Sequence, residues 1–482
     1  MKLVQGAKRK PLTFEIADGP DPVFLRIAAT LVGEIQRGRL RSGMLLPGTR
    51  ELAKQLGVHR NTVCAAFNEL VSQGWAVSKK RQGTFVASSL PQVVRVGTST
   101  RARDIPDDAA SEIDFRDALP ASPWFPSTEF AASFRSALVG EAQGREHVYP
   151  DGLREVLAEL LGASRGLVIG SDNLLITRSA QMNLFVAARY LSKHTASIFV
   201  EEPGSPAAWS AFRAAGLTPI AVRVDRHGMD PDRLSAAMRK HAARALYITP
   251  SCQFPTTVDL AANRKARLLS VAQKGGLTIL EDDHANDFCG GDSLPLPLAA
   301  HPDSDQIIYM GSFGNLLQRG LGIGYLSAPP KTIAEIAEIQ LTIDDAVSAG
   351  FQGAIAEILK SGDLIRYARK IRREMGERRQ LSSTLLIDTF GDRIDVKTPN
   401  AGSAIWMDMF SGPDMDMLRA QSLRLGLRLG DTSAYYFQAR PHAFRLGVGN
   451  LAVSEIAKAV RRFKLADIVS RCASSPNWDL DC

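Results

Sequence analysis

The chain has 482 residues, of which 45% are hydrophobic and 23% are charged, as is typical of soluble globular proteins. This length predicts two or more domains, because single hydrophobic cores stop growing beyond about 250–300 residues. The composition excludes collagenous and low-complexity proteins, and no apolar stretch is long enough to cross a bilayer. The first ten residues lack the apolar segment of a secretory signal, so we expect none.

The cysteines are few and dispersed. Five of them occur, at Cys64, Cys252, Cys289, Cys472 and Cys482. Their spacing matches no metal-ligand motif, so we expect no metal site. An odd, scattered set is typical of reduced thiols, which predicts a cytoplasmic protein.

Positive charge is concentrated in the first ninety residues. Residues 1–90 contain 14 Lys and Arg against 6 Asp and Glu, a net charge of +8, whereas the whole chain carries +7. The rest of the chain therefore sums to −1. A basic excess confined to one small region is typical of a domain that binds a polyanion, although a merely solvated basic face is the ordinary alternative.

The apolar periodicity of the first ninety residues predicts three helices and a hairpin. The helices are expected at 21–38, 50–56 and 60–72, with Thr49 as the N-cap of the second. Two short strands are expected at 75–77 and 84–86. This order predicts a winged helix-turn-helix in residues 1–87, whose third helix enters the major groove of DNA.

The third helix begins with side chains that suit base recognition. Arg60 can bond guanine, Asn61 can bond adenine, and Thr62 can reach a phosphate or a thymine methyl group. Helix capping is the ordinary alternative for Asn61 or Thr62 taken alone. Further DNA contacts are expected from the second helix and from the hairpin tip, at Arg50, Lys79, Lys80, Arg81 and Gly83.

These residues also carry a family resemblance. The segments GRLRSGMLLPGTRELAKQLGVHRNTVCAAFNELVSQGW and RQGTFVA resemble the winged helix-turn-helix of the GntR regulator family. The resemblance implies DNA contacts at Arg50, Arg60, Asn61, Thr62 and Gly83. One departure is Cys64, where many members have arginine, which implies that one contact of the family is missing.

The remaining chain is predicted to be a linker followed by an α/β domain. Residues 88–112 are polar and contain two prolines, which is typical of a flexible linker. From 113 to 469, short apolar strands alternate with helices, which predicts a mostly parallel sheet buried on both faces. Ligands of such sheets bind beyond the carboxyl ends of the strands. Residues 470–482 are expected to form a C-terminal tail.

Several turns that follow the predicted strands carry a second resemblance. The tripeptide Ser179-Ala180-Gln181 opens a helix, where free N–H groups favour an anion. Together with TPSCQFP, EDDH, GSFGN and FRLGVGNL, this segment resembles the fold-type I aminotransferase domain. A GntR-like head joined to such a domain resembles the MocR regulator subfamily, over roughly residues 20–465.

The resemblance implies pyridoxal phosphate, which requires a lysine for the Schiff base and an acid for the pyridine nitrogen. The family sequence Gly-Thr-Phe-Ser-Lys is replaced here by Gly311-Ser312-Phe313-Gly314-Asn315, and asparagine cannot form an imine. Where the family has a phosphate-binding arginine, this chain has Gly322. The nearby Arg319 is a weak substitute for it. We therefore expect neither covalent cofactor nor enzymatic activity, with non-covalent cofactor binding as the alternative.

Other family positions are partly kept. The resemblance places Asp282 at the pyridine nitrogen, Arg445 at a substrate carboxylate, and Tyr149 in a neighbouring subunit's cleft. Ordinary structural roles remain as alternatives: a strand cap for Asp282, a salt bridge for Arg445, and packing for His284 and Cys252. The expected degenerate cofactor or effector cleft comprises Tyr149, Ser179, Ala180, Gln181, Gln253, Asp282, His284, Ser312, Asn315 and Arg445.

The sequence thus predicts a homodimeric regulator that binds a double-stranded DNA operator and whose body either senses an amino-acid-like molecule or only dimerises the heads. A regulator that binds pyridoxal phosphate non-covalently is the main alternative. A working aminotransferase is a third hypothesis, which would need a lysine elsewhere that reaches the ring.

Overall fold

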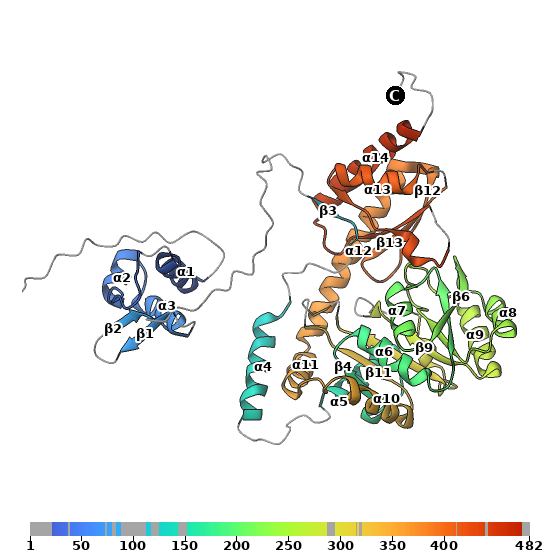
Figure 1. The fold of residues 1–482 in the computed structure, drawn as a ribbon, viewed down its shortest axis with the longest axis horizontal. Helices are drawn as coiled ribbons and strands as arrows, with labels where there is room; N and C mark the ends of the chain where they lie inside the picture. Colours follow the sequence, from blue (N-terminus) through green and yellow to red (C-terminus); the bar gives the residue numbers. More distant parts are fainter. Residues whose placement is uncertain are drawn as a thin grey trace, which may run out of the picture. The chain divides into compact units, whose positions relative to one another are not determined.

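The computed structural model describes residues 22–36, 39–72, 75–79, 83–87, 112–116, 125–142, 152–286, 295–314, 316–317, 321–410, 412–438 and 442–474. The chain divides into two compact units, residues 1–107 and 108–482, which we call the head and the body (Figure 1). Among the helices that the structure describes, none is both long and apolar enough to span a membrane.

The head is a winged helix-turn-helix, as the sequence predicts. Its elements are α1 (Val23–Gln36), α2 (Thr49–Leu56), α3 (Arg60–Ser72), β1 (Ala76–Lys79) and β2 (Gly83–Val86). The apolar stripes of the three helices meet in one core, which contains Ile27, Leu31, Leu52, Val63 and Leu70. β1 and β2 pair antiparallel, and Leu45 forms a bridge to Phe85 that extends this wing.

Two details of the head differ from the prediction. Thr49 is the first residue of α2 rather than its cap; the cap position is Gly48, which forms no side-chain cap bond. The prediction that Thr49 caps the helix is therefore wrong, and its hydroxyl instead accepts a bond of 3.4 Å from Arg60 Nε. The first wing strand begins at Ala76 and not at Trp75, although the Trp75 carbonyl still accepts the N–H of Ala87 at 2.9 Å.

The body contains an eight-stranded sheet in the order β4-β11-β10-β9-β8-β5-β6-β7. Neighbouring strands from β10 through β6 run parallel, whereas β11 and β7 run antiparallel to their neighbours. This arrangement confirms the predicted mostly parallel sheet. The strands are β4 (Leu174–Thr177), β5 (Ser197–Glu202), β6 (Thr218–Asp225), β7 (Gly228–Met229), β8 (Ala245–Ile248), β9 (Thr278–Asp282), β10 (Ile307–Ser312) and β11 (Gly324–Ser327).

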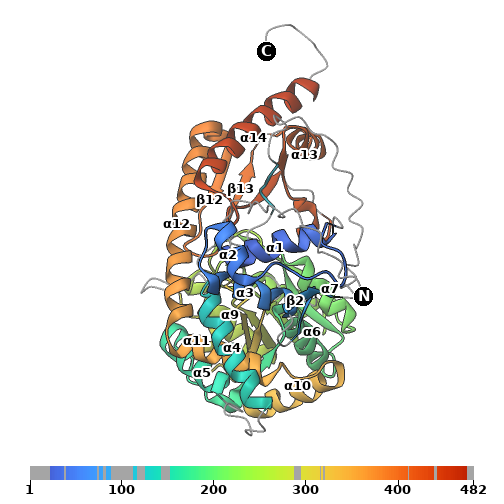
Figure 2. The same cartoon turned by 90° about the vertical axis from the view of Figure 1, so that its left-hand side faces the viewer.

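Helices cover both faces of this sheet (Figures 1 and 2). The even positions of β10, Ile308 and Met310, pack against α6 (Ala180–Leu191), α7 (Pro206–Ala214) and α10 (Pro330–Ile343). The odd positions of β10 face the opposite helices, because successive strand side chains alternate between faces. Those helices are α5 (Gly152–Arg165), α8 (Pro231–Lys240), α9 (Ala262–Gly275) and α11 (Ala349–Lys360), and α4 (Ser127–Ala142) packs on α11.

A second, smaller lobe completes the body. Its sheet has the order β12-β13-β15, and a two-stranded pair joins β14 to β3. The helix α12 spans both lobes, because Ile371 and Met375 belong to the core of the large sheet and Leu386 and Phe390 to the core of the small one. The elements of this lobe are β3 (Ile113–Asp114), α12 (Asp363–Phe390), β12 (Ile394–Lys397), β13 (Ala404–Met409), α13 (Met415–Arg424), β14 (Leu427–Arg428), β15 (Ala443–Gly447) and α14 (Val453–Ser474).

The last helix passes the predicted start of the C-terminal tail. α14 continues to Ser474, beyond the expected boundary at residue 469, and the Ser470 side chain is buried. The expected linker, 88–112, lies almost entirely outside the described residues. The described chain resumes with Glu112 and β3, which pairs in parallel with β14.

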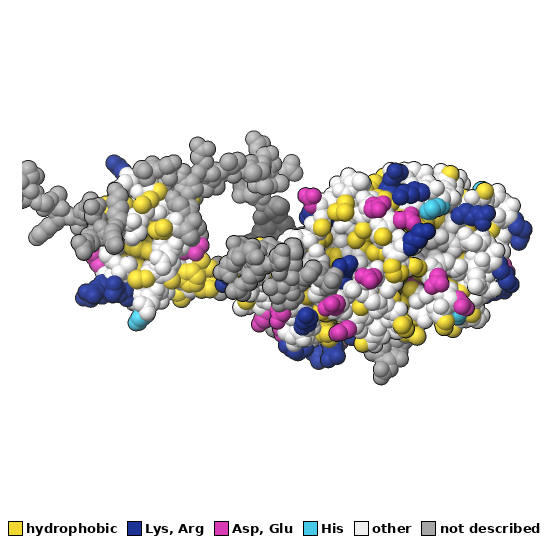
Figure 3. Space-filling model, turned by 90° about the horizontal axis from the view of Figure 1, so that it is seen from below, with side chains coloured by type: hydrophobic (Ala, Val, Ile, Leu, Met, Phe, Trp, Pro, Cys, Tyr) yellow, Lys and Arg dark blue, Asp and Glu magenta, His cyan; other side chains and the backbone are white. Residues whose placement is uncertain are grey.

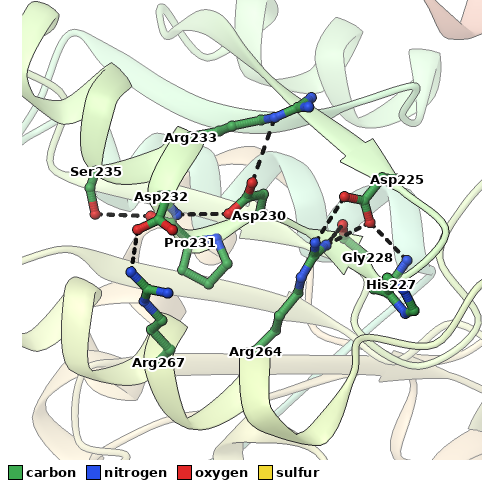
Figure 4. A network of polar contacts seen from close by, with 10 residues as sticks. All are labelled: Asp225, His227, Gly228, Asp230, Pro231, Asp232, Arg233, Ser235, Arg264 and Arg267. Atoms are coloured by element: carbon green, nitrogen blue, oxygen red, sulfur yellow. Dashed lines mark hydrogen bonds and ion pairs between the residues drawn. The ribbon is translucent and has the colours of Figure 1, made fainter.

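A polar network fixes one edge of the large sheet (Figure 4). The Arg264 guanidinium on α9 donates to Asp225 at 2.6 Å and to the Gly228 carbonyl at 2.7 Å. On α8, Asp230 caps the N–H of Asp232 at 2.9 Å, and Asp232 forms an ion pair with Arg267. The network therefore ties α8, α9 and the turn between β6 and β7 together.

The buried Asn183 side chain joins α6 to the ends of three strands. Its Nδ2 donates to the carbonyls of Gly311 (2.9 Å) and Tyr325 (3.1 Å), and its Oδ1 accepts from the Thr177 hydroxyl (2.5 Å). One amide thus satisfies groups from β4, β10 and β11. These strand ends border the region in which the sequence predicts a ligand site.

We expect Asn183→Ala to lower the free energy of unfolding by about 3 kcal/mol, because two buried carbonyls lose their donor. Gln273→Ala, at an exposed position on α9, is the matched control and should change stability by less than about 0.5 kcal/mol. Urea unfolding followed by circular dichroism measures both variants. Equal, small effects would contradict the role assigned to Asn183.

Candidate functional site

The exposed start of α3 is the candidate DNA-reading surface. Arg60 and Asn61 are exposed, and Thr62 is half-buried. His59 caps this end, because its Nδ1 accepts the N–H of Asn61 at 3.3 Å and its carbonyl accepts the N–H of Thr62 at 3.0 Å. The capping role that the sequence allowed for Asn61 or Thr62 is therefore taken by another residue. This arrangement leaves the side chain of Asn61 at the surface.

Arginines from two helices lie close to this surface. Arg50 at the start of α2 is exposed, and Arg60 is held beside α2 by its bond to Thr49. Figure 3 shows dark blue side chains gathered at one corner of the small unit, next to a histidine. Of the wing cations, Lys80 and Arg81 lie outside the described residues, and only the backbone of Lys79 is described.

The backbone conformation of the wing explains why residue 83 is glycine. Gly83 adopts φ +109°, and a Cβ there would lie 2.8 Å from Leu45 Cδ1. That backbone conformation disfavours side chains, whereas the exposed Leu45 side chain could shift away. The backbone of the wing therefore favours glycine at this position, in addition to any approach to DNA.

In the body, Ser179 and Ser312 lie where β4 and β10 end, Ser179 at the start of α6 and Ser312 as the last residue of β10. Ser179 is the N-cap of α6, with its hydroxyl accepting the N–H of Met182 at 3.1 Å, and Ala180 begins the helix. Ser312 ends β10, pairs with Gly324, and accepts the N–H of Gly314 at 3.3 Å. Both hydroxyls thus bond their own turns. The exposed Gln181 donates instead to the Ala207 carbonyl at 3.3 Å.

Asp282 is the last residue of β9, and its carboxylate is buried. It accepts a bond of 2.8 Å from the Tyr247 hydroxyl. Burial raises the pKa of Asp282, while the neighbouring His284 and the bond from Tyr247 oppose that rise. A second buried carboxyl, Glu201, accepts both the N–H and the hydroxyl of Thr249, at 3.0 and 2.6 Å. Two carboxyl groups therefore lie beneath the carboxyl ends of the parallel strands.

Residues 250–260 after β8 form a loop that is closed by its own hydrogen bonds. The Leu260 N–H bonds the Pro250 carbonyl at 2.8 Å, and the Cys252 N–H bonds the Asp259 carboxylate at 2.8 Å. The buried amide of Gln253 donates to the carbonyls of Pro203 and Phe254. Gln253 therefore shapes the loop from inside.

Two residues of this loop have left-handed backbone conformations. Cys252 has φ +57° and Thr257 has φ +61°. A β-branched residue at such a φ costs about 1–3 kcal/mol. The Thr257 hydroxyl partly compensates, because it donates to the Lys397 carbonyl of β12 at 3.4 Å.

The Cys252 thiol is buried and unsuited to nucleophilic chemistry. Burial raises its pKa to about 12, and its Sγ donates to the Ala401 carbonyl at 3.6 Å. It packs with Ala285 and Ala401. The Cys252 carbonyl accepts the Nε2–H of His284 at 3.0 Å, so His284 is oriented by the loop.

Arg445 on β15 reaches this loop from the small lobe. Its guanidinium lies over the Phe254 ring, 4.8 Å from the ring centre, and Tyr435 packs edge-on against the same ring. Its Nε is buried and has no hydrogen-bond partner among the residues that the structure describes. Burial lowers the pKa of Arg445, which Tyr435 and Cys252 partly oppose. Within the described chain, the side chain is thus a cation without an anion.

The structure brings Gln253, His284 and Arg445 together around one loop, while Ser179 and Ser312 each lie against Gly324 of β11. Tyr149 and Asn315 lie outside the described residues, as does Arg319. Gly322 is described, and a Cβ there would lie 3.6 Å from the Arg178 carbonyl. Arg178 itself is exposed and forms an ion pair with Asp344.

Sequence reasoning missed the partners of these residues. Tyr247, whose hydroxyl donates to Asp282, stands in the sequence as one more residue of an apolar strand. No neighbouring residue in the sequence indicates that it has a polar partner. Phe254, Tyr435 and Trp406 together form an aromatic wall near Arg445. Only the register Trp406↔Arg445 between β13 and β15 places the tryptophan there, and register is not visible in sequence.

A separate pocket of about 200 Å³ opens at the opposite ends of the parallel strands, beside the residues with which these strands begin. Its lining includes Ile307, Tyr309 and Ser327. None of the site residues expected from the sequence lines it.

Comparison with known proteins supports both halves of this description. Residues 24–86 match the family model "Bacterial regulatory proteins, gntR family". The chain is 26% identical to the uncharacterized HTH-type transcriptional regulator YdeL of Bacillus subtilis (strain 168), over 92% of this chain and 96% of that protein. It is 25% identical to the probable rhizopine catabolism regulatory protein MocR of Rhizobium meliloti, over 88% and 89%.

Several solved structures that are similar to the body are aminotransferases. LysN, the alpha-aminoadipate aminotransferase of Thermus thermophilus, superimposes with a TM-score of 0.67 at 24% identity, over 75% of this chain and 93% of that one. An archaeal alanine:glyoxylate aminotransferase gives 0.68 at 22%, over 75% and 92%. The body therefore has the fold-type I aminotransferase fold, and at these identities the likeness extends to the fold alone.

The pKa of the buried Glu201 carboxyl is raised from 4.5 to about 7, chiefly by burial. Between these values the native state binds more protons than the unfolded chain, so this group makes stability fall as pH rises. We expect it to remove about 3 kcal/mol between pH 4.5 and 7.5.

Glu201→Gln should reduce the fall in stability by about that amount, because the amide oxygen can still accept from Thr249 but does not titrate. The buried Glu281, whose pKa burial also raises to about 7, keeps a slope of its own. Urea midpoints measured across that pH range test the prediction. The exposed Glu338→Gln on α10 is the matched control and should keep the native slope. An unchanged slope in Glu201→Gln would show that this carboxyl is ionised throughout.

Proposed function

We propose that this protein is a sequence-specific transcription regulator that binds a double-stranded DNA operator as a homodimer. The observation that carries the proposal is the exposed start of α3, with Arg60 and Asn61 at the surface, in a head that matches a DNA-binding family model. A recognition helix in the major groove reads bases with these side chains.

A dimer is proposed on physical grounds. A single helix-turn-helix contacts one short half-site, and linking two heads converts the second contact into an intramolecular event. The body is the part of the chain large enough to hold two heads together. Relatives matched along nearly their whole length are named as HTH-type transcriptional regulators, which supports the same assignment.

For the body we propose a ligand-sensing role without aminotransferase activity. Pyridoxal phosphate, held by an imine and an arginine, does not fit the residues present. Position 315 is asparagine and position 322 is glycine, while the nearby Arg178 is already paired with Asp344.

An amino-acid-like effector suits the charges that remain. Arg445 is a half-buried cation without an ion pair among the described residues, so a ligand carboxylate would satisfy it. Asp282 offers a buried carboxyl group for a ligand amine. Non-covalent pyridoxal phosphate is the second candidate, because Asp282 stands where the similar family binds the pyridine nitrogen and Ser179 opens α6.

The head predicts a contrast between two substitutions. Arg60→Ala should cost about 1–3 kcal/mol of operator affinity and relax base preference, because a base contact is lost. Lys80→Ala should weaken all sequences alike and lower the salt dependence by about one counterion. Fluorescence anisotropy on an operator obtained by in vitro selection, at several salt concentrations, distinguishes them. Unchanged operator affinity in Arg60→Ala would refute this orientation of α3.

The body predicts no covalent cofactor. After incubation with pyridoxal phosphate and reduction by borohydride, mass spectrometry should find only scattered, substoichiometric lysine adducts. A stoichiometric adduct at one lysine would reveal another anchor and restore the enzyme hypothesis.

The effector is sought by thermal shift with each of the twenty amino acids and with pyridoxal phosphate, since a ligand of the native state raises Tm. Arg445→Gln should abolish the shift that the native protein shows, whereas Arg223→Gln, an exposed arginine on β6, should keep it. If no compound shifts the native protein, the sensing role fails and the DNA-binding role stands.

A further inference from the structure

The segment 398–403, between β12 and β13, is held by one arginine from another element. Arg379 projects from α12 and is buried. Its Nε donates to the Pro399 carbonyl at 3.0 Å, its Nη2 to the Asn400 carbonyl at 3.2 Å, and its Nη1 to the Gly402 carbonyl. One guanidinium therefore binds three carbonyls within four residues of chain. We call residues 399–402 the arginine-held loop.

The arginine-held loop lies directly against the candidate ligand site. The Ala401 carbonyl accepts the Cys252 thiol, and a Cβ on Gly402 would lie 3.5 Å from Cys252 Sγ. Arg379 is near enough that its charge offsets part of the rise in the pKa of Cys252. Cys252 in turn orients His284 through its carbonyl. A path of direct contacts thus runs from Arg379 to a residue of the site.

We propose that Arg379 is the positioning residue of the ligand site: it fixes the arginine-held loop against Cys252 and so sets the shape of the wall beside Arg445. Arg379 makes these contacts through backbone carbonyls and does not need to touch the ligand. The proposal depends on the proposed sensing role in one respect: it takes the region beside Arg445 to be a ligand site. The geometry of the loop can be tested without any ligand.

The chemistry of the guanidinium explains why arginine is needed here. Its donors lie in one rigid plane and point in fixed directions, so a single side chain can bond several carbonyls at once. A lysine would bring the same charge, but its ammonium is a single point on a flexible stem. Arg379→Lys therefore removes the planar fork and keeps the positive charge, which separates positioning from electrostatics.

The position of Arg379 on α12 gives the loop a route to the rest of the body. α12 contributes Met375 to the core of the large sheet and Leu386 to the core of the small lobe, one on each side of Arg379. Movement of the arginine-held loop would therefore act on the helix that joins both cores.

The test is the alkylation rate of Cys252 by iodoacetamide, followed residue by residue with mass spectrometry on the full-length protein. In the native protein the buried thiol should react slowly, and its rate should still rise above pH 10, because its pKa is about 12. In Arg379→Lys we expect a rate at least tenfold higher at pH 8, and a profile that levels off near the ordinary pKa of 9.0.

Arg378→Lys is the matched control, since Arg378 is the adjacent arginine of α12 and bonds a carbonyl elsewhere, that of Gly449 at 2.5 Å. This variant should keep the native rate and the native pH profile at Cys252. The half-buried Cys64 of the head is the internal reference, and its rate should be the same in all three proteins. The circular dichroism spectrum and urea midpoint of each variant exclude general unfolding as the cause of faster labelling.

Labelling of Cys252 at the native rate in Arg379→Lys would overturn the proposal, and so would equal acceleration in Arg378→Lys. Where Arg379→Lys fails to fold, Arg379→Gln with added guanidinium replaces it; slowing of Cys252 labelling by guanidinium supports the proposal, and no slowing refutes it. Absence of any amino-acid effect on Tm would remove the sensing role while leaving this labelling result unchanged, so the two failures are distinguishable.

Discussion

A parallel sheet buried on both faces constrains where this body can place polar groups. The residues of β8 and β10 face helices on either side, so only the strand ends remain open to polar side chains. Asp282, Ser312 and the loop after β8 all follow from this constraint, because each lies where a strand ends. Asn183 then satisfies the backbone at the same edge, which is required because unpaired carbonyls there would be costly.

The two lobes of the body meet through side chains of one lobe that bind groups of the other. Arg445 comes from the small sheet and lies over Phe254 of the large lobe, while the Cys252 thiol and the Thr257 hydroxyl bond carbonyls of the small lobe. The region around the loop after β8 is therefore a joint as well as a site. A ligand bound to Arg445, as proposed for the body, would contact side chains of both lobes at once.

Much of this architecture follows from sequence, because it depends on local patterns. The helices of the head, the alternation of strands and helices, and the Ser179 cap are all encoded in neighbouring residues. The interactions that sequence reasoning missed join distant segments: Tyr247 with Asp282, Arg379 with the arginine-held loop, and Trp406 with Arg445. They depend on register and helix rotation, which no local pattern specifies. The Thr49 cap failed for a simpler reason, since glycine at position 48 can occupy the cap and leaves threonine inside the helix.

The left-handed backbone of Thr257 has a consequence for how the body fluctuates. Its conformational cost, about 1–3 kcal/mol, is a noticeable part of a net folding stability that for ordinary domains is about 5–15 kcal/mol. That energy is recovered whenever the loop after β8 detaches, even if the sheet stays intact. The opening free energy of the loop is therefore lower, by that amount, than its hydrogen bonds and buried contacts alone would give. The segment that joins the lobes is thus held less firmly than its contacts suggest.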